Sequence, residues 1–235
     1  MRTLFSMLVG LLLFSFSVSG QAYHELSLGV KGNRLFEVNP PEFILQDLDY
    51  LFGPQLGYQL YFPDNRFSFL AKAAWFRESG LKEYSSSLVG SDNEYRETSR
   101  RNSVSFDLEL GWNVVEFDNS FLQLTAGARA QKVYFFSQEV ERTDRDDIDP
   151  RYIQFTRWKD FNYSLVSTFS YQFFLTERAS LKEQSLALRF AADFVYSLPV
   201  YRSLGPAENE FATLATGLTV SLIWRIRGKE NRGLF

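Results

Sequence analysis

The sequence predicts an all-β fold, an eight-stranded antiparallel transmembrane β-barrel with short periplasmic turns and long extracellular loops. Three observations lead to this prediction. Apolar and polar residues alternate in eight separate segments, which is typical of strands with one apolar face. The connections between these segments are alternately short and mostly long. A secretory leader precedes the first segment, so we expect a signal peptide at 1–22 and the barrel domain at 23–235.

The alternation is clearest between Val104 and Val114, where every even-numbered residue is apolar. The residues between them include Asp107 and Glu109. Successive side chains of a strand point to opposite faces, so one face of this segment is apolar and the other carries two acids. Its length is also enough to cross a bilayer at a tilt, which takes about 9–11 residues.

The first four predicted strands have an apolar residue at every second position. Their ranges are Tyr23–Lys31, Pro54–Phe62, Arg66–Phe76 and Ser103–Val114. Their apolar positions are Leu26, Leu28 and Val30, then Leu56, Tyr58, Leu60 and Phe62, then Phe67, Phe69, Ala71, Ala73 and Trp75, then Val104, Phe106, Leu108, Leu110, Trp112 and Val114.

The last four predicted strands show the same alternation over most of their length. Their ranges are Ser120–Phe136, Phe161–Leu175, Ser185–Leu198 and Phe211–Ile226. Their apolar positions are Leu122, Leu124, Ala126, Ala128 and Ala130, then Tyr163, Leu165, Phe169, Tyr171 and Phe173, then Leu186, Leu188, Phe190, Ala192, Phe194 and Tyr196, then Leu214, Leu218, Val220, Leu222, Trp224 and Ile226.

The connections give the barrel its predicted orientation. The connections after the second, fourth and sixth strands are fairly short, at 63–65, 115–119 and 176–184. The other connections are mostly longer, at 32–53, 77–102, 137–160 and 199–210. In outer-membrane barrels the short turns lie in the periplasm, so we expect both termini there and the long connections outside. We expect 77–102, which mixes acids and bases, to be a mobile surface segment.

The first residues have the features of a secretory leader. Arg2 supplies the positive charge, residues 4–16 are apolar, and the residues up to Ala22 are mostly small. Cleavage before Tyr23 and cleavage before Gln21 both fit this pattern. The alternative is a retained membrane helix, but the apolar run is shorter than the roughly 20 residues that a spanning helix needs.

Composition excludes several kinds of site. The chain has no cysteine, which rules out cysteine nucleophiles and cysteine ligands for zinc. Its net charge of −3 gives no reason to expect a nucleic-acid partner. Because His24 is the single histidine and starts the first strand, we interpret it as structural and expect no transition-metal site, no cofactor and no catalysis. The acidic run 144–149 lacks the glycine of a calcium loop, so a solvated loop is favoured over a calcium site.

Aromatic residues cluster near the strand ends, as expected of rings at the two membrane interfaces. The predicted periplasmic girdle contains Phe62, Phe67, Trp112, Phe121, Phe173 and Trp224. The predicted outer girdle contains Trp75, Phe76, Tyr134, Phe136, Phe161, Tyr163, Tyr196 and Phe211.

Charged residues lie opposite the apolar faces, and we expect them inside the barrel. They are Glu25, Lys72, Asp107, Glu109, Arg129, Arg189, Asp193 and Arg225. Side chains can fill an eight-stranded barrel, and unpaired buried charges are costly. We therefore expect a paired network that closes the lumen, with the three arginines facing Asp107, Glu109 and Asp193.

The layout from Tyr23 to Ile226 resembles that of the small eight-stranded outer-membrane β-barrel proteins, the OmpX-like class, and of the PorT-like outer membrane protein β-barrel families. The resemblance implies location in a Gram-negative outer membrane, contact with the bilayer and lipopolysaccharide, and insertion by the outer-membrane assembly machinery. That machinery reads an aromatic-rich last strand, which Leu218–Ile226 fits, although 227–233 interrupts the alternation before Phe235.

These features favour a monomeric, non-enzymatic envelope scaffold, or a binding or secretion-accessory protein that works through its loops. Two other functions stay open: a narrow porin-like conduit for small solutes and a lipid-modifying outer-membrane enzyme. A soluble lipocalin-like barrel also stays open, because alternation does not say which face is outside. That barrel would point the apolar residues inward.

Overall fold

The computed structural model describes residues 23–37, 44–62, 66–86, 93–142, 156–158, 161–175, 184–203 and 210–227. They form the strands β1 (Tyr23–Glu37), β2 (Ile44–Phe62), β3 (Phe67–Ser86), β4 (Asn93–Phe117), β5 (Ser120–Arg142), β6 (Thr156–Trp158), β7 (Phe161–Phe174), β8 (Gln184–Ser203) and β9 (Glu210–Arg227). Within these residues, no helix has the length and apolarity needed to cross a membrane.

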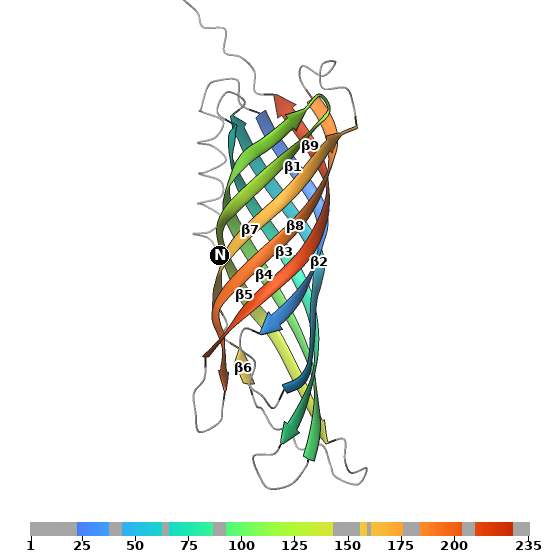
Figure 1. The fold of residues 1–235 in the computed structure, drawn as a ribbon, viewed down its shortest axis with the longest axis vertical. Coiled ribbons are helices and arrows are strands. Elements are labelled where there is room, and N and C mark those ends of the chain that lie inside the picture. Colours follow the sequence, from blue (N-terminus) through green and yellow to red (C-terminus); the bar gives the residue numbers. More distant parts are fainter. Residues whose placement is uncertain are drawn as a thin grey trace, which may run out of the picture.

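Eight of the strands close into an antiparallel barrel, as the sequence predicts. The order around the barrel is β1, β2, β3, β4, β5, β7, β8 and β9, and β9 pairs with β1 from Tyr23–Arg227 to Glu37–Thr213. Strand β6 was not predicted and stands outside the barrel; among the described strands it pairs only with the end of β8. We call the end at Tyr23 the turn end and the opposite end, near Ser86, the loop end; they are at the top and bottom of Figure 1.

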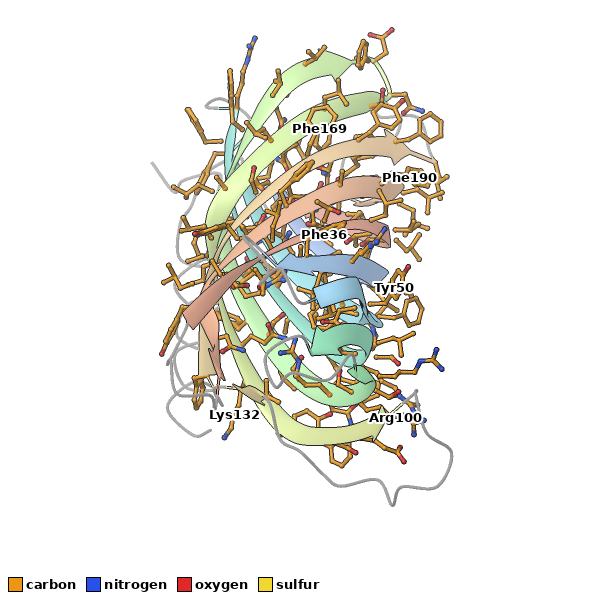
Figure 2. The ribbon with its side chains drawn as sticks, turned by 60° about the horizontal axis from the view of Figure 1, so that its bottom comes forward. Phe36, Tyr50, Arg100, Lys132, Phe169 and Phe190 are labelled. Carbon is orange, nitrogen blue, oxygen red and sulfur yellow. The ribbon has the colours of Figure 1, made fainter. Side chains whose placement is uncertain are left out.

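Apolar side chains cover the outside of the barrel. Along β7 every second side chain is buried, and the side chains between are exposed except Ser167, which is half-buried. Phe169 and Phe190 belong to the outward set (Figure 2), and Leu110 and Leu218 are 70% and 71% exposed. An apolar surface this continuous is unfavourable in water and is the surface that contacts hydrocarbon in a membrane barrel. The soluble alternative, with the same residues pointing inward, is therefore wrong.

The strands run further toward the loop end than predicted. Strand β2 begins at Ile44 rather than Pro54. Strand β3 ends at Ser86 rather than Phe76, and β4 begins at Asn93 rather than Ser103. Most of the residues predicted as the loops 32–53 and 77–102 are therefore paired strand, as are parts of 137–160 and 199–210. In 77–102 polar residues occupy both odd- and even-numbered positions, so the sequence shows no apolar alternation there although the backbone pairing continues.

A polar sheet projects beyond the closed ring at the loop end. Strand β5 pairs with β7 only as far as Lys132–Phe161, yet it continues to Arg142 alongside β4. Figure 1 shows β3, β4 and β5 extending past the other strands at the bottom. We call residues 81–86, 93–98 and 133–142 the outer extension.

Several predictions fall on residues outside the described ones. These are the signal peptide and its cleavage sites, the turn 63–65, the acidic run 144–149, most of the connection 176–184, and Phe235. The short connection between β4 and β5 is described, and it narrows to the turn Asp118–Asn119.

Candidate functional site: the barrel lumen

The lumen is where the chain gathers its buried charges. The structure places Glu25, Lys72, Asp107, Glu109, Arg129, Arg189, Asp193 and Arg225 on the inward face, each less than 9% exposed. They come from β1, β3, β4, β5, β8 and β9. Strand alternation puts each of them inside because its neighbours on either side point outward to the apolar surface.

The charged layer nearest the turn end is organised around one carboxylate. The Arg225 Nε donates to Glu25 Oε1 at 2.6 Å, and the Arg189 Nη2 donates to Oε2 at 2.7 Å. Gln172 also donates to Glu25, and Arg189 donates to the side-chain oxygens of Gln172 and Gln59. Glu25 thus joins β1 to its neighbour β9 and, across the lumen, to β7 and β8.

An aromatic cluster closes the lumen at the turn end. We call Tyr61, Phe121, Phe174 and Ile223 the aromatic plug; each is at most 2% exposed. The Arg225 guanidinium carbon lies 4.7 Å from the ring centre of Phe174 and 5.1 Å from that of Tyr61. The cation–π contacts join the plug to the Glu25 layer.

Two ion pairs occupy the middle of the lumen. The Lys31 Nζ lies 3.2 Å from Asp193 Oδ2, and the Lys72 Nζ lies 2.6 Å from Glu109 Oε1. The Asp193 carboxylate also accepts hydrogen bonds from the hydroxyl groups of Thr168 and Thr219, each at 2.7 Å. The ion pairs and hydroxyl donors offset part of the penalty of burying these charges, although the Lys31 Nζ has no hydrogen-bond partner among the described residues.

Asp107 and Arg129 form the most direct pair in the lumen. They lie opposite each other on β4 and β5, and the guanidinium donates two hydrogen bonds to the carboxylate, at 2.7 and 2.6 Å. This two-pronged geometry is among the strongest that side chains make. The Arg129 guanidinium also lies 5.9 Å from the ring centre of Phe76.

An apolar layer fills the lumen on the loop-end side of these charges. Its members are Leu35, Leu51, Ala74, Phe76, Val166, Val195 and Ala215. Further along the same strands, Glu78 of β3 accepts a hydrogen bond from Arg101 Nε of β4 at 2.5 Å, with both residues buried. The lumen therefore alternates between charged and apolar layers.

Two small cavities lie between the described side chains of these layers. One lumen cavity of about 20 Å³ is bounded by Lys72, Thr125, Arg189 and Asp193, and another of about 20 Å³ lies near Arg101 and Arg129. A volume of this size holds about one water molecule. The side chains described here thus leave no wide aqueous passage along the barrel.

The partners of the charges differ from the expected ones. Arg129 faces Asp107 as expected, but Arg189 and Arg225 pair with Glu25 rather than with Glu109 and Asp193. Those two acids pair with Lys72 and Lys31 instead. Strand tilt and stagger decide which levels of distant strands meet, and sequence alternation carries no information about them.

Sequence reasoning also missed inward residues. Lys31 shares the parity of Glu25 and is fully buried, so alternation was a sufficient signal for it. Glu78 and Arg101 were missed because they lie beyond the predicted strand ends. Gln59, Gln123 and Gln172 carry no charge, so a prediction based on charged residues does not include them.

Most of the predicted girdle residues face outward. Trp75, Trp112, Tyr134, Tyr163, Phe173, Tyr196 and Trp224 are all 40–60% exposed, and the Trp75 indole donates a hydrogen bond to the Tyr134 hydroxyl. The prediction that Phe76 and Phe121 belong to the girdles is wrong, because these side chains are 0% and 1% exposed and point inward. Phe76 is next to Trp75 in the strand, and Phe121 is next to Leu122, so each must point to the opposite face from its neighbour. A prediction based only on clustering at strand ends does not use this alternation.

His24 lies at the turn end, where its Nδ1 is 2.8 Å from the Tyr58 hydroxyl. The imidazole is half-buried beside that ring. Among the described residues, no group of three or more histidine, aspartate and glutamate side chains is placed to hold a metal ion.

No protein-family model matches the chain, and no curated protein matches it in sequence. Among solved structures, the chain is similar to the outer membrane protein OprG from Pseudomonas aeruginosa, at 10% identity and a TM-score of 0.48, over 89% of this chain and 96% of that chain. It is also similar to Ail, the attachment invasion locus protein of Yersinia pestis, at 13% identity and a TM-score of 0.42, over 87% of this chain and 99% of that chain.

A third similar structure is the outer membrane protease OmpT from Escherichia coli, at 11% identity and a TM-score of 0.45, over 89% of this chain and 97% of that chain. At such identities and scores the likeness goes no further than the general fold. What this chain does is therefore inferred from its own residues.

Proposed function

We propose that this chain is a Gram-negative outer-membrane barrel protein with a sealed lumen, a non-enzymatic envelope scaffold that meets other molecules through its outer extension. The observation that carries the proposal is the combination of an apolar outside with a filled inside. The outside suits lipid, and the inside leaves no wide path for solutes. What remains for contact with partners is the polar surface at the two ends of the barrel.

The outer extension supports a contact role better than the lumen does. Among the described strands, none pairs with β5 on its β7 side beyond Lys132. A strand edge with free backbone groups is a common place for a second chain to bind. An envelope or secretion protein is the partner class that we propose.

Two further aspects of the proposal have their own support. The outward face of β9 presents Leu218, Val220, Leu222 and Trp224, each more than 40% exposed, which fits insertion by the outer-membrane assembly machinery through an aromatic-rich last strand. The absence of enzymatic activity is proposed because the single histidine sits at the turn end and hydrogen-bonds to Tyr58, away from the outer rim where lipid chemistry at the cell surface would occur.

The location is tested by cell fractionation and a gel assay. We expect the protein in the outer-membrane fraction. We also expect it to migrate differently before and after boiling, because a closed barrel resists unfolding by detergent until it is heated. Recovery from the soluble periplasm without this shift would refute the proposed location.

The sealed lumen is tested by conductance in planar bilayers. Refolded protein that shows the heat-dependent shift is expected to give no discrete current steps, because charged and apolar layers fill the barrel. An open porin added to the same bilayer serves as the positive control. Regular single-channel steps from the folded protein would favour the narrow conduit over the scaffold.

A further inference from the structure

A hollow interrupts the apolar outer wall. Its volume is about 540 Å³, and it spans the outside of β8, β9, β1 and β2. Its lining includes the small residues Gly32, Ala192 and Thr216 and the larger residues Phe52, Phe194 and Leu218. The volume lies within the range of sites for small ligands, roughly 300–1,000 Å³.

The strand register explains why the wall is hollow here. Phe52, Gly32, Leu218 and Ala192 lie side by side in one row across β2, β1, β9 and β8. Gly32 has no side chain and Ala192 has only a methyl group, so at two of the four positions in this row no large side chain projects from the outer wall. A Cβ added at Gly32 would meet only Phe52, at 3.8 Å, which shows that the space above Gly32 is open.

A basic side chain stands at the loop-end edge of the hollow. Arg34 lines it and is exposed, and its guanidinium carbon lies 4.8 Å from the ring centre of Phe36. Phe36 is two residues nearer the loop end, so the Arg34 side chain reaches away from the bilayer centre. Arginine side chains on membrane proteins extend in this way toward the phosphate level.

Arg77 marks the other side of the site. It lies beside Phe52 on β3, in the same row as Gly32, and is exposed. Two strand spacings and two residues separate Arg34 from Arg77, which places their Cα atoms about 12 Å apart. Neither arginine makes an ion pair with a carboxylate of the described residues.

Among the side chains that the structure describes, the charges on this part of the outer wall are mostly of one sign. The charged outward side chains described near the loop end are Arg34, Arg77, Arg96, Arg100 and Lys132, together with Glu139. Arg100 and Lys132 are labelled in Figure 2. Five of these six side chains are basic, although the chain as a whole carries a net charge of −3.

We propose that this face binds a diphosphorylated glycolipid of the lipid A kind. One acyl chain lies in the hollow over Gly32, and the two phosphates of the head group contact Arg34 and Arg77. The hollow accounts for the chain and the two separated, unpaired arginines account for two phosphates. The inference rests on the proposed outer-membrane location, since such a lipid fills the outer leaflet.

The proposal is tested by lipid titration followed by native mass spectrometry. Refolded full-length protein in zwitterionic detergent is titrated with lipid A, with monophosphoryl lipid A and with phosphatidylglycerol. The R34Q/R77Q variant is expected to bind lipid A about tenfold more weakly, the loss expected for charge-assisted hydrogen bonds. G32L, which fills the hollow, is expected to weaken binding as well. K132Q removes an outward cation on the more distant β5 and is the matched control.

The outcomes separate this site from the proposed function. Unchanged affinity in R34Q/R77Q, or phosphatidylglycerol binding as tightly as lipid A, would overturn the site while leaving the barrel in place. The heat-dependent gel shift, measured on every variant in lipid-free detergent, reports the barrel alone. A wild-type protein without the shift would instead count against the outer-membrane proposal itself.

Discussion

Replacing Glu25 by glutamine is expected to lower the free energy of unfolding by about 3–5 kcal/mol, because it leaves Arg189 and Arg225 buried without a counter-charge. The side-chain volume hardly changes, so the loss reports the charge rather than packing. Urea unfolding of the protein refolded into vesicles, followed by tryptophan fluorescence, measures the effect.

Two further variants sharpen this test. Glu139→Gln removes an exposed carboxylate of the outer extension and is expected to change the free energy of unfolding by about 0.5 kcal/mol or less. Adding Arg225→Met to Glu25→Gln removes one of the two stranded cations and is expected to recover part of the loss. A Glu25→Gln protein as stable as the wild type would show that the layer contributes no net stability.

Replacing Phe121 by alanine is expected to cost about 3–5 kcal/mol, because the ring is buried in the aromatic plug and its loss leaves a cavity. The ring also contacts Phe174 and Tyr61, with ring centres 6.0 Å apart in each case, so neighbouring packing is lost as well. The same vesicle unfolding assay provides the measurement.

Phe169→Ala is the matched control for the plug. Phe169 is 47% exposed on the outward face, where lipid can fill the space that the ring leaves. We therefore expect a clearly smaller loss than for Phe121→Ala. Equal losses for the two variants would mean that the plug packs no better than the lipid-facing wall.

The difference between Phe121 and Phe169 illustrates how much parity alone can predict. Alternation assigned the eight charged residues to one face and most large apolar residues to the other. It also implies the inward positions of Lys31, Phe76 and Phe121, although the predicted lumen set omits Lys31 and the predicted girdles place both phenylalanines outside. The face to which a side chain points alternates from one residue to the next within a strand, so it can be predicted from the sequence of that strand alone.

Strand ends were harder to predict than strand faces. The outer halves of β3 and β4 are polar at most odd- and even-numbered positions, so no pattern distinguishes them from loops. The outer half of β2 does not show a simple pattern either, because Asp49 and Leu51 point inward whereas Tyr50 and Phe52 point outward. Their pairing is decided by hydrogen bonds to neighbouring strands that are already aligned by the barrel.

The sequence by itself determined the strand order, the antiparallel barrel and the face on which each charge lies, because these follow from local alternation and connection length. Only the tertiary structure decided that Glu25 forms ion pairs with both Arg189 and Arg225. It also decided that Gly32 and Ala192 lie in the same row across the strands and leave a hollow beside Arg34. Those contacts join strands far apart in the chain, and the stagger that closes the barrel sets them.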